Sequence, residues 1–82
     1  MSNVTVFSTT WCAFRKSAKA YFDKLGVEYE DQDVERDIAA QGYMVEKTHQ
    51  MGVPVIQIGD EFVVGFDEGR IDSLLKSQGI SK

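Results

Sequence analysis

Residues 53–64 read VPVIQIGDEFVV, and this stretch constrains the fold more tightly than any other part of the chain. Mostly apolar, β-branched residues stand on either side of Gly59-Asp60, which is typical of two strands joined by a two-residue turn. We therefore expect one strand over residues 53–58 and a second over residues 61–64. A connection of this length forces the two strands to pair antiparallel.

Upstream of this hairpin, the sequence predicts a strand, a helix and a second strand. Residues 3–8 (NVTVFS) alternate β-branched and aromatic side chains, as a strand does. Hydroxyl groups suited to helix capping follow at Ser8, Thr9 and Thr10. From Cys12 onward, apolar residues recur at helical spacing until Gly26 ends the pattern; they are Phe14, Ala18, Tyr21, Phe22 and Leu25. Residues 27–34 (VEYEDQDV) then predict a polar strand at or near a sheet edge.

Two further helices complete the predicted order. Residues from Glu35 to about Gln50 return to helical spacing through Ile38, Gly42 and Val45. The last helix carries an apolar stripe at Ile71, Leu74 and Leu75, with Gly79 beyond its end. The order is β-α-β-α-β-β-α, and its strand-helix-strand start favours a parallel pair. We expect an α/β sandwich with a four-stranded mixed sheet and three helices that cover both faces.

Composition bounds the class of protein. The 82 residues fit one small domain over residues 1–82, and 43% hydrophobic with 27% charged residues argues against disorder. One cysteine allows no internal disulfide, and we find neither a signal peptide nor a membrane-spanning segment, so we expect a cytoplasmic protein. A net charge of −4 disfavours nucleic acid as a partner.

An acidic run accounts for much of this charge; its members are Glu28, Glu30, Asp31, Asp33, Glu35 and Asp37. It could in principle hold a cation, but it lacks the glycine turn of a calcium loop. We favour a solvated edge strand followed by the start of a helix.

Three segments together resemble the glutaredoxins, which have the thioredoxin fold. They are Thr10-Trp11-Cys12 with Phe14, Gly52-Val53-Pro54-Val55, and Val64-Gly65-Phe66-Asp67-Glu68. The resemblance spans nearly the whole chain. The usual redox motif of that family is C-P-Y-C, whereas this chain has Cys12-Ala13-Phe14-Arg15, so the proline and the second cysteine are missing.

Cys12 is the candidate nucleophile. A helix N-terminus favours the thiolate and lowers the pKa of a thiol there, although a lone cysteine can also be a buried packing residue. At i+3, Arg15 could pair with the thiolate or with a substrate carboxylate, or it could be solvated. Without a second cysteine the chain cannot act as a dithiol reductant, so any catalysis through Cys12 is monothiol.

The resemblance implies a particular reaction. In the family's monothiol scheme Cys12 attacks the glutathione sulfur of a glutathionylated protein, and a second glutathione releases the enzyme. Glutathione or another low-molecular-weight thiol is then a co-substrate, with no permanently bound cofactor and no metal, and we expect a monomer. Two alternatives stay open. One is a dimer that holds an iron–sulfur cluster through Cys12 and glutathione, as relatives with a C-G-F-S turn do. The other is a redox-degenerate thioredoxin-fold module that binds partners at Val53-Pro54.

The resemblance also assigns the remaining site residues. It implies a cis bond before Pro54 that presents the backbone of Val53 to the cysteinyl part of glutathione, although a proline at the first residue of a strand also fits. It places Gly65, Phe66 and Asp67 at the γ-glutamyl end, although an ordinary N-cap at Asp67 explains that residue as well. Trp11 and Phe14 would lie beside the thiol.

The chain departs from the family at two further positions. Thr9 stands where the family often has a lysine, and Val64-Gly65 where it often has two glycines. Arg15, Lys16 and Gln50 are then the candidates to replace the lysine in binding the glycine-end carboxylate. The single histidine, His49, is expected to be a helix-terminal residue.

Overall fold

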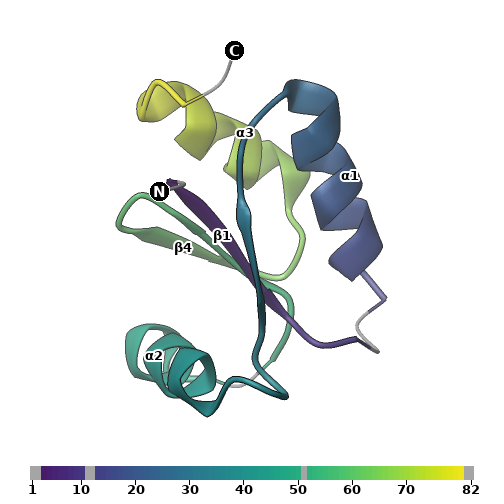
Figure 1. Cartoon of the computed structure of the whole chain (residues 1–82). Coiled ribbons are helices and arrows are strands. Elements are labelled where there is room, and N and C mark those ends of the chain that lie inside the picture. The colour runs from purple at the N-terminus through teal and green to yellow at the C-terminus, as the bar shows by residue number, and fades with distance from the viewer. Residues whose placement is uncertain (1–2, 11–12, 51, 81–82) are drawn as a thin grey trace.

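The computed structural model describes residues 3–10, 13–50 and 52–80, and within them it has the predicted order of elements (Figure 1). The strands are β1 (Val4–Ser8), β2 (Glu30–Asp33), β3 (Val55–Ile58) and β4 (Glu61–Val64). The helices are α1 (Arg15–Leu25), α2 (Ile38–Thr48) and α3 (Glu68–Ser77). No helix in these residues is long and apolar enough to cross a membrane.

The four strands form one mixed sheet in the order β2-β1-β3-β4. β1 pairs parallel with β2 and antiparallel with β3, and β3 pairs antiparallel with β4, so the predicted fold class is confirmed. Phe7 lies opposite Val55, which in turn lies opposite Val64. The carboxyl ends of β1 and β4 and the amino end of β3 therefore meet at one end of the sheet, which we call the site end.

Alternate residues of β1 face two separate apolar clusters. Val4 and Val6 lie in the larger cluster, which contains Phe22 of α1 and Ile71 of α3. Phe7 lies in the smaller cluster with Met44 of α2. Figure 1 shows the same arrangement, with α1 and α3 on one side of the sheet and α2 on the other. The prediction that helices cover both faces is confirmed.

The start of α1 differs from the prediction. The helix begins at Arg15 and not at Cys12, its N-cap is Phe14, and no side chain caps it. The hydroxyls of Ser8 and Thr9 do not cap it, because Ser8 is the last residue of β1 and both residues are buried. The end of the helix is as expected, since Gly26 adopts a left-handed conformation (φ 70°) and ends it.

The apolar stripe predicted for α2 is also wrong in part. Ile38 is 79% exposed, whereas Met44 is fully buried and Val45 packs beside it. The helix starts three residues later than expected because Asp37 caps it, with its Oδ1 accepting a hydrogen bond from the backbone N–H of Ala40 at 3.0 Å. Ile38 is thus the first residue of α2, and its side chain points largely into solvent.

β2 and β3 are shorter than predicted. β2 covers Glu30–Asp33, and the apolar residues that flank it, Val27 and Val34, are buried in the two clusters. β2 is an edge strand, as expected. β3 begins at Val55 and not at residue 53, and proline at position 54 has no N–H for a sheet hydrogen bond.

Candidate functional site

Three loops meet at the site end of the sheet. The register brings together the segment that follows β1, the segment that precedes β3 and the segment that follows β4. These are the three segments that carry the predicted site residues. The first and second of these segments lie about 40 residues apart in the sequence, so the pairing of the strands brings them together.

Two contacts tie these loops together. The backbone N–H of Gly65 donates a hydrogen bond to the carbonyl oxygen of Pro54 at 2.8 Å. The rings of Phe14 and Phe66 lie 6.4 Å apart at an interplanar angle of 34°. Phe66 also meets Tyr21 of α1 edge to face at 5.8 Å, which connects this end of the molecule to the larger cluster. Phe14 itself stays 54% exposed.

The peptide bond between Val53 and Pro54 is cis, so that prediction is confirmed. Val53 is half-buried, and its backbone N–H and carbonyl have no hydrogen-bond partner in the described part of the chain. A backbone segment with both groups unpaired can accept an extended ligand as a short additional strand.

The segment that leads into α3 has the geometry of a helix N-terminus. Asp67 is the N-cap, and its Oδ1 accepts a hydrogen bond from the backbone N–H of Arg70 at 3.2 Å. The ordinary N-cap expected at Asp67 is therefore confirmed. Gly65 has φ 88°, a left-handed backbone conformation that side chains disfavour. A helix N-terminus of this kind favours an anionic group nearby.

Trp11 and Cys12 lie outside the described residues, so the predictions made for them stay predictions. The structure describes the residues that precede and follow them in the chain. Ser8 and Thr9 are buried just before them, and the first turn of α1 follows with Arg15 and Lys16. No acidic residue occurs in that first turn.

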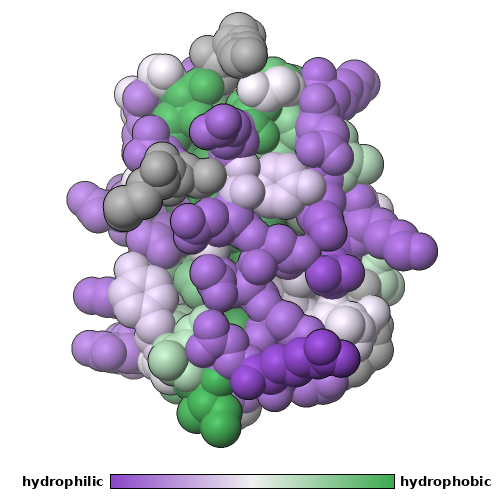
Figure 2. Space-filling model, viewed as in Figure 1, coloured by the Kyte–Doolittle hydropathy of each residue, from purple (hydrophilic) through white to green (hydrophobic). Residues whose placement is uncertain are grey.

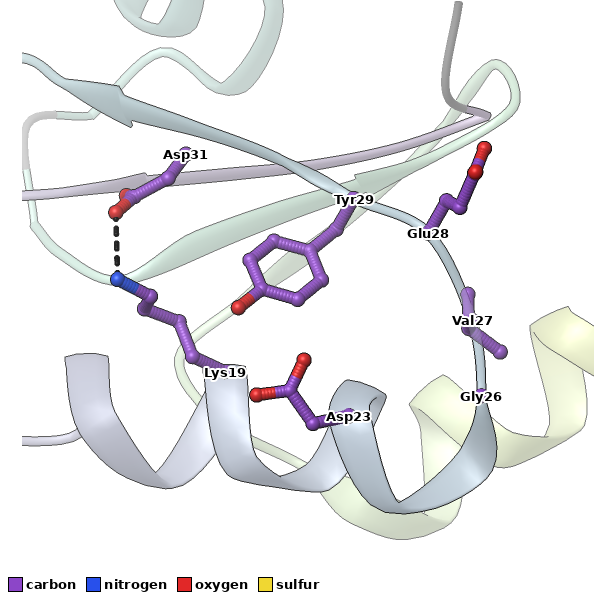
Figure 3. Close-up of a pocket in the computed structure, with 7 residues that line it drawn as sticks. All are labelled: Lys19, Asp23, Gly26, Val27, Glu28, Tyr29 and Asp31. Atoms are coloured by element: carbon purple, nitrogen blue, oxygen red, sulfur yellow. Dashed lines mark ion pairs between the residues drawn. The ribbon is translucent and has the colours of Figure 1, made fainter.

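Arg15 has a partner that the sequence did not reveal. Its Nη2 lies 2.7 Å from Oδ2 of Asp31 on β2, and Nζ of Lys19 lies 3.0 Å from the same oxygen. Figure 3 shows the Lys19–Asp31 ion pair at the end of a hollow. Asp31 belongs to the acidic run, but nothing in the sequence says which of those residues faces α1. Glu30 and Asp33 lie on the edge strand and Asp37 caps α2, as expected, whereas Glu28 and Glu35 lie just outside these elements.

The three candidates for binding a carboxylate are placed differently. Arg15 is paired with Asp31. The side-chain amide of Gln50 is bonded to its own loop, because its nitrogen donates to the carbonyl of Gly52 at 3.2 Å and its oxygen accepts from the N–H of Gly52. Lys16 is exposed and has no ion pair with any described residue. His49 is the C-cap of α2, in agreement with its predicted helix-terminal position.

A shallow hollow of about 690 Å³ lies beside this region, between α1 and the chain that leads into β2 (Figure 3). It is lined by Lys19, Asp23, Gly26, Val27, Glu28, Tyr29 and Asp31. Burial, and then the nearby Asp23 carboxylate, raise the pKa of the Tyr29 hydroxyl. The charges in this hollow are mixed, and none of the described residues of the three converging loops line it. The hollow is therefore separate from the candidate site. The face seen in Figure 2 is mostly hydrophilic, with small apolar areas toward its two ends.

Comparison with known proteins identifies the family. Residues 4–63 match the family model for glutaredoxin, and the chain therefore belongs to the glutaredoxin family. A relative from Clostridium pasteurianum, an uncharacterized glutaredoxin-like 8.6 kDa protein in the rubredoxin operon, is 32% identical over 89% of this chain and 97% of its own length. Glutaredoxin 3 of Escherichia coli (strain K12) is 26% identical over 93% of this chain and all of its own length.

Solved structures agree with this assignment. The glutaredoxin of Archaeoglobus fulgidus has the same fold, with a TM-score of 0.82 at 20% identity over 93% of this chain and 88% of its own. Buckwheat glutaredoxin, solved as a complex with glutathione, has a TM-score of 0.75 at 27% identity over 96% of this chain and 81% of its own. The predicted family and thioredoxin fold are both confirmed.

Proposed function

We propose that this chain is a monothiol oxidoreductase that reduces mixed disulfides between proteins and glutathione, or a similar small thiol, through Cys12. The observation that carries the proposal is the convergence of three loops at the site end of the sheet. The loop with the only cysteine, the loop with cis-Pro54 and the loop into α3 meet there, held by the Phe14–Phe66 contact and the Gly65–Pro54 hydrogen bond.

The reaction proceeds in two exchanges. The Cys12 thiolate attacks the glutathione sulfur of a glutathionylated protein, a disulfide forms between Cys12 and glutathione, and the protein leaves as a thiolate that takes up a proton. The thiolate of a second glutathione then attacks the glutathione sulfur bound to Cys12. Glutathione disulfide leaves and the Cys12 thiolate is restored, so each turnover converts the glutathionylated protein and one free glutathione into the protein thiol and glutathione disulfide. No second cysteine in the chain is needed.

The charges around the first turn of α1 favour an anion there. Arg15 and Lys19 share one carboxylate, that of Asp31, so these three groups carry a net positive charge. Lys16 adds another cation in the same turn. A positive field of this kind favours a thiolate over a thiol and attracts an anionic substrate.

Described residues offer a binding mode for glutathione. The unpaired backbone groups of Val53 suit the cysteinyl part of the tripeptide, and the N-terminus of α3 at Gly65, Phe66 and Asp67 suits its γ-glutamyl end. For the glycine-end carboxylate we propose Lys16, because Arg15 and Gln50 already have partners within the chain. We propose Trp11 and Phe14 as apolar neighbours of the thiol.

Intact-mass measurement tests the proposal directly. The protein is incubated with glutathione disulfide, and in parallel with cystine, and the adduct is then treated with the matching reduced thiol. We expect one glutathione adduct per chain that reduced glutathione releases rapidly, and no adduct in Cys12→Ser. Because the chain has one cysteine, the adduct reports on Cys12 alone.

Two outcomes would count against the proposal. A wild-type thiol that forms no adduct would show that Cys12 is not a working nucleophile. An adduct that reduced glutathione cannot release would favour the partner-binding alternative. We also propose a cytoplasmic, monomeric protein with one domain over residues 1–82; anaerobic reconstitution that gave a coloured dimer would point instead to the iron–sulfur alternative.

A further inference from the structure

Buried polar atoms without partners occur in the stretch of chain on either side of Cys12. Among the described residues, three buried side-chain atoms have no hydrogen-bond partner, and they are Ser8 Oγ, Thr9 Oγ1 and Arg15 Nε. Ser8 is 0% exposed and Thr9 is 5% exposed, so bulk solvent does not satisfy them. Buried polar groups nearly always have partners, so a group that lacks one needs an explanation, and a catalytic role is one such explanation. All three lie in the eight residues 8–15, which include Cys12.

Asp31 restricts the position of Arg15. Its Oδ2 holds Nη2 of Arg15 at 2.7 Å, from a strand that lies 16 residues further along the chain. Both side chains are about three-quarters buried, with 26% and 23% exposed. A guanidinium is planar, so a contact that fixes one terminal nitrogen also restricts the direction of Nε–H. One terminal nitrogen of this guanidinium is therefore paired with Asp31, while its Nε is buried and has no hydrogen-bond partner among the described residues.

We propose that Asp31 is a positioning residue for Arg15. Its carboxylate holds the guanidinium against β2 so that the Nε–H stays available as a hydrogen-bond donor to the Cys12 thiolate. The buried hydroxyls of Ser8 and Thr9 are further donors in the same stretch. This inference rests on the proposed function and adds to it a residue that touches neither the sulfur nor the substrate.

If Asp31 positions Arg15, its loss should raise the pKa of the Cys12 thiol, whereas if Asp31 acts only through its charge, its loss should lower that pKa. The charged groups around Arg15 are Lys16 and Lys19 on α1 and Asp31 on β2, and β2 also carries Glu30 and Asp33. Glu68 and Asp72 on α3 act on Tyr21, further along α1. Removal of one negative charge makes this surrounding more positive and so favours the thiolate. Loss of a positioned donor does the reverse.

The test is Asp31→Asn, with the alkylation rate of the thiol by iodoacetamide followed against pH. The chain has one cysteine, so the rate reports on Cys12 without ambiguity. We expect the pKa of the Cys12 thiol to rise in the variant, and the rate at pH 6.5 to fall about threefold to tenfold, because a hydrogen bond from a charged donor stabilises the thiolate. An unchanged or lower thiol pKa would overturn the inference.

Two controls isolate the role of Arg15. Glu30→Gln removes the same charge from the neighbouring exposed position, which forms no hydrogen bond or ion pair with Arg15, and should leave the thiol pKa unchanged or slightly lower. In an Arg15→Gln background, Asp31→Asn should no longer raise the thiol pKa, and a rise that persists there would also overturn the inference. Circular dichroism checks that each variant is folded.

The failure of this inference differs from the failure of the proposed function. A wild-type protein that forms no glutathione adduct would remove the proposed function. The thiol pKa of the Asp31 variants would still report whether Asp31 acts through Arg15, since alkylation requires no glutathione.

Discussion

Phe66 connects the candidate site to the interior, and its replacement separates a functional from a structural role. It is half-buried, with its ring 6.4 Å from that of Phe14 in one direction and 5.8 Å from that of Tyr21 in the other. Phe66→Ala removes both contacts. We therefore expect a loss of stability together with a loss of order where Phe14 meets the α3 loop.

The size of the stability loss follows from these contacts. Each aromatic pair contributes about 0.5–1.5 kcal/mol beyond buried area, and Phe→Ala at a fully buried site costs about 3–5 kcal/mol. Because Phe66 is only half-buried, we expect the free energy of unfolding to fall by about 2–3 kcal/mol. In a domain of this size that lowers Tm by about 10–20 °C.

Phe62 provides a matched control on the other face of the sheet. It is also half-buried, it packs against the smaller cluster, and its ring lies 6.2 Å from that of Tyr43. Phe62→Ala should lose a similar amount of stability in urea titrations. At a temperature where both variants are folded, we expect Phe66→Ala to lower kcat/KM for a glutathionylated peptide about tenfold, which corresponds to about 1.4 kcal/mol. Phe62→Ala should stay within about twofold of the wild type.

Equal effects of the two changes on kcat/KM would refute this reasoning. They would mean that activity follows global stability and that the Phe14–Phe66 contact has no special role. A retained activity in Phe66→Ala with the expected stability loss would lead to the same conclusion.

Two further predictions concern stability. Met44→Ala should lower the free energy of unfolding by about 2–5 kcal/mol, because Met44 is fully buried. Ile38→Ala on the same helix should change it by no more than about 0.5 kcal/mol, because Ile38 is 79% exposed. Urea titration measures both changes, and equal losses would contradict the assigned helix face. Burial, and then the Asp72 and Glu68 carboxylates, raise the pKa of Tyr21, so the contribution of the neutral hydroxyl to the free energy of unfolding is present below about pH 10 and is lost as the pH rises above that value. Tyr21→Phe should therefore lose less stability than the wild type in urea titrations at pH 8–11. An identical alkaline loss in both proteins would contradict this role of Tyr21.

Local patterns in the sequence predicted the elements well, for physical reasons that involve only neighbouring residues. Gly26 ends α1 in a left-handed conformation, and Gly59 forms the hairpin turn with φ 61°. Asp67 caps α3 with its own side chain. Each of these depends on the backbone preferences of one residue and on partners a few positions away.

Other features could not be predicted from such patterns. Helical spacing alone did not indicate that Ile38 lies at the exposed first position of α2 while Met44 faces the sheet. The hydroxyls of Ser8 and Thr9 predict a helix start that is too early, because Ser8 ends β1 and both residues are buried. In both cases the packing of the element against the sheet decides the outcome, and propensity has little influence.

The sequence was enough to determine the number, type and order of the elements, the family and the candidate nucleophile, because periodicity, turn residues and short motifs are local properties. Only the tertiary structure decided which distant residues meet. The pairing of Arg15 with Asp31, the contact of Phe14 with Phe66 and the hydrogen bond from Gly65 to Pro54 depend on strand register and on how α1 docks on the sheet. Many acidic residues were available to Arg15, and the register of β2 against β1 selected one of them.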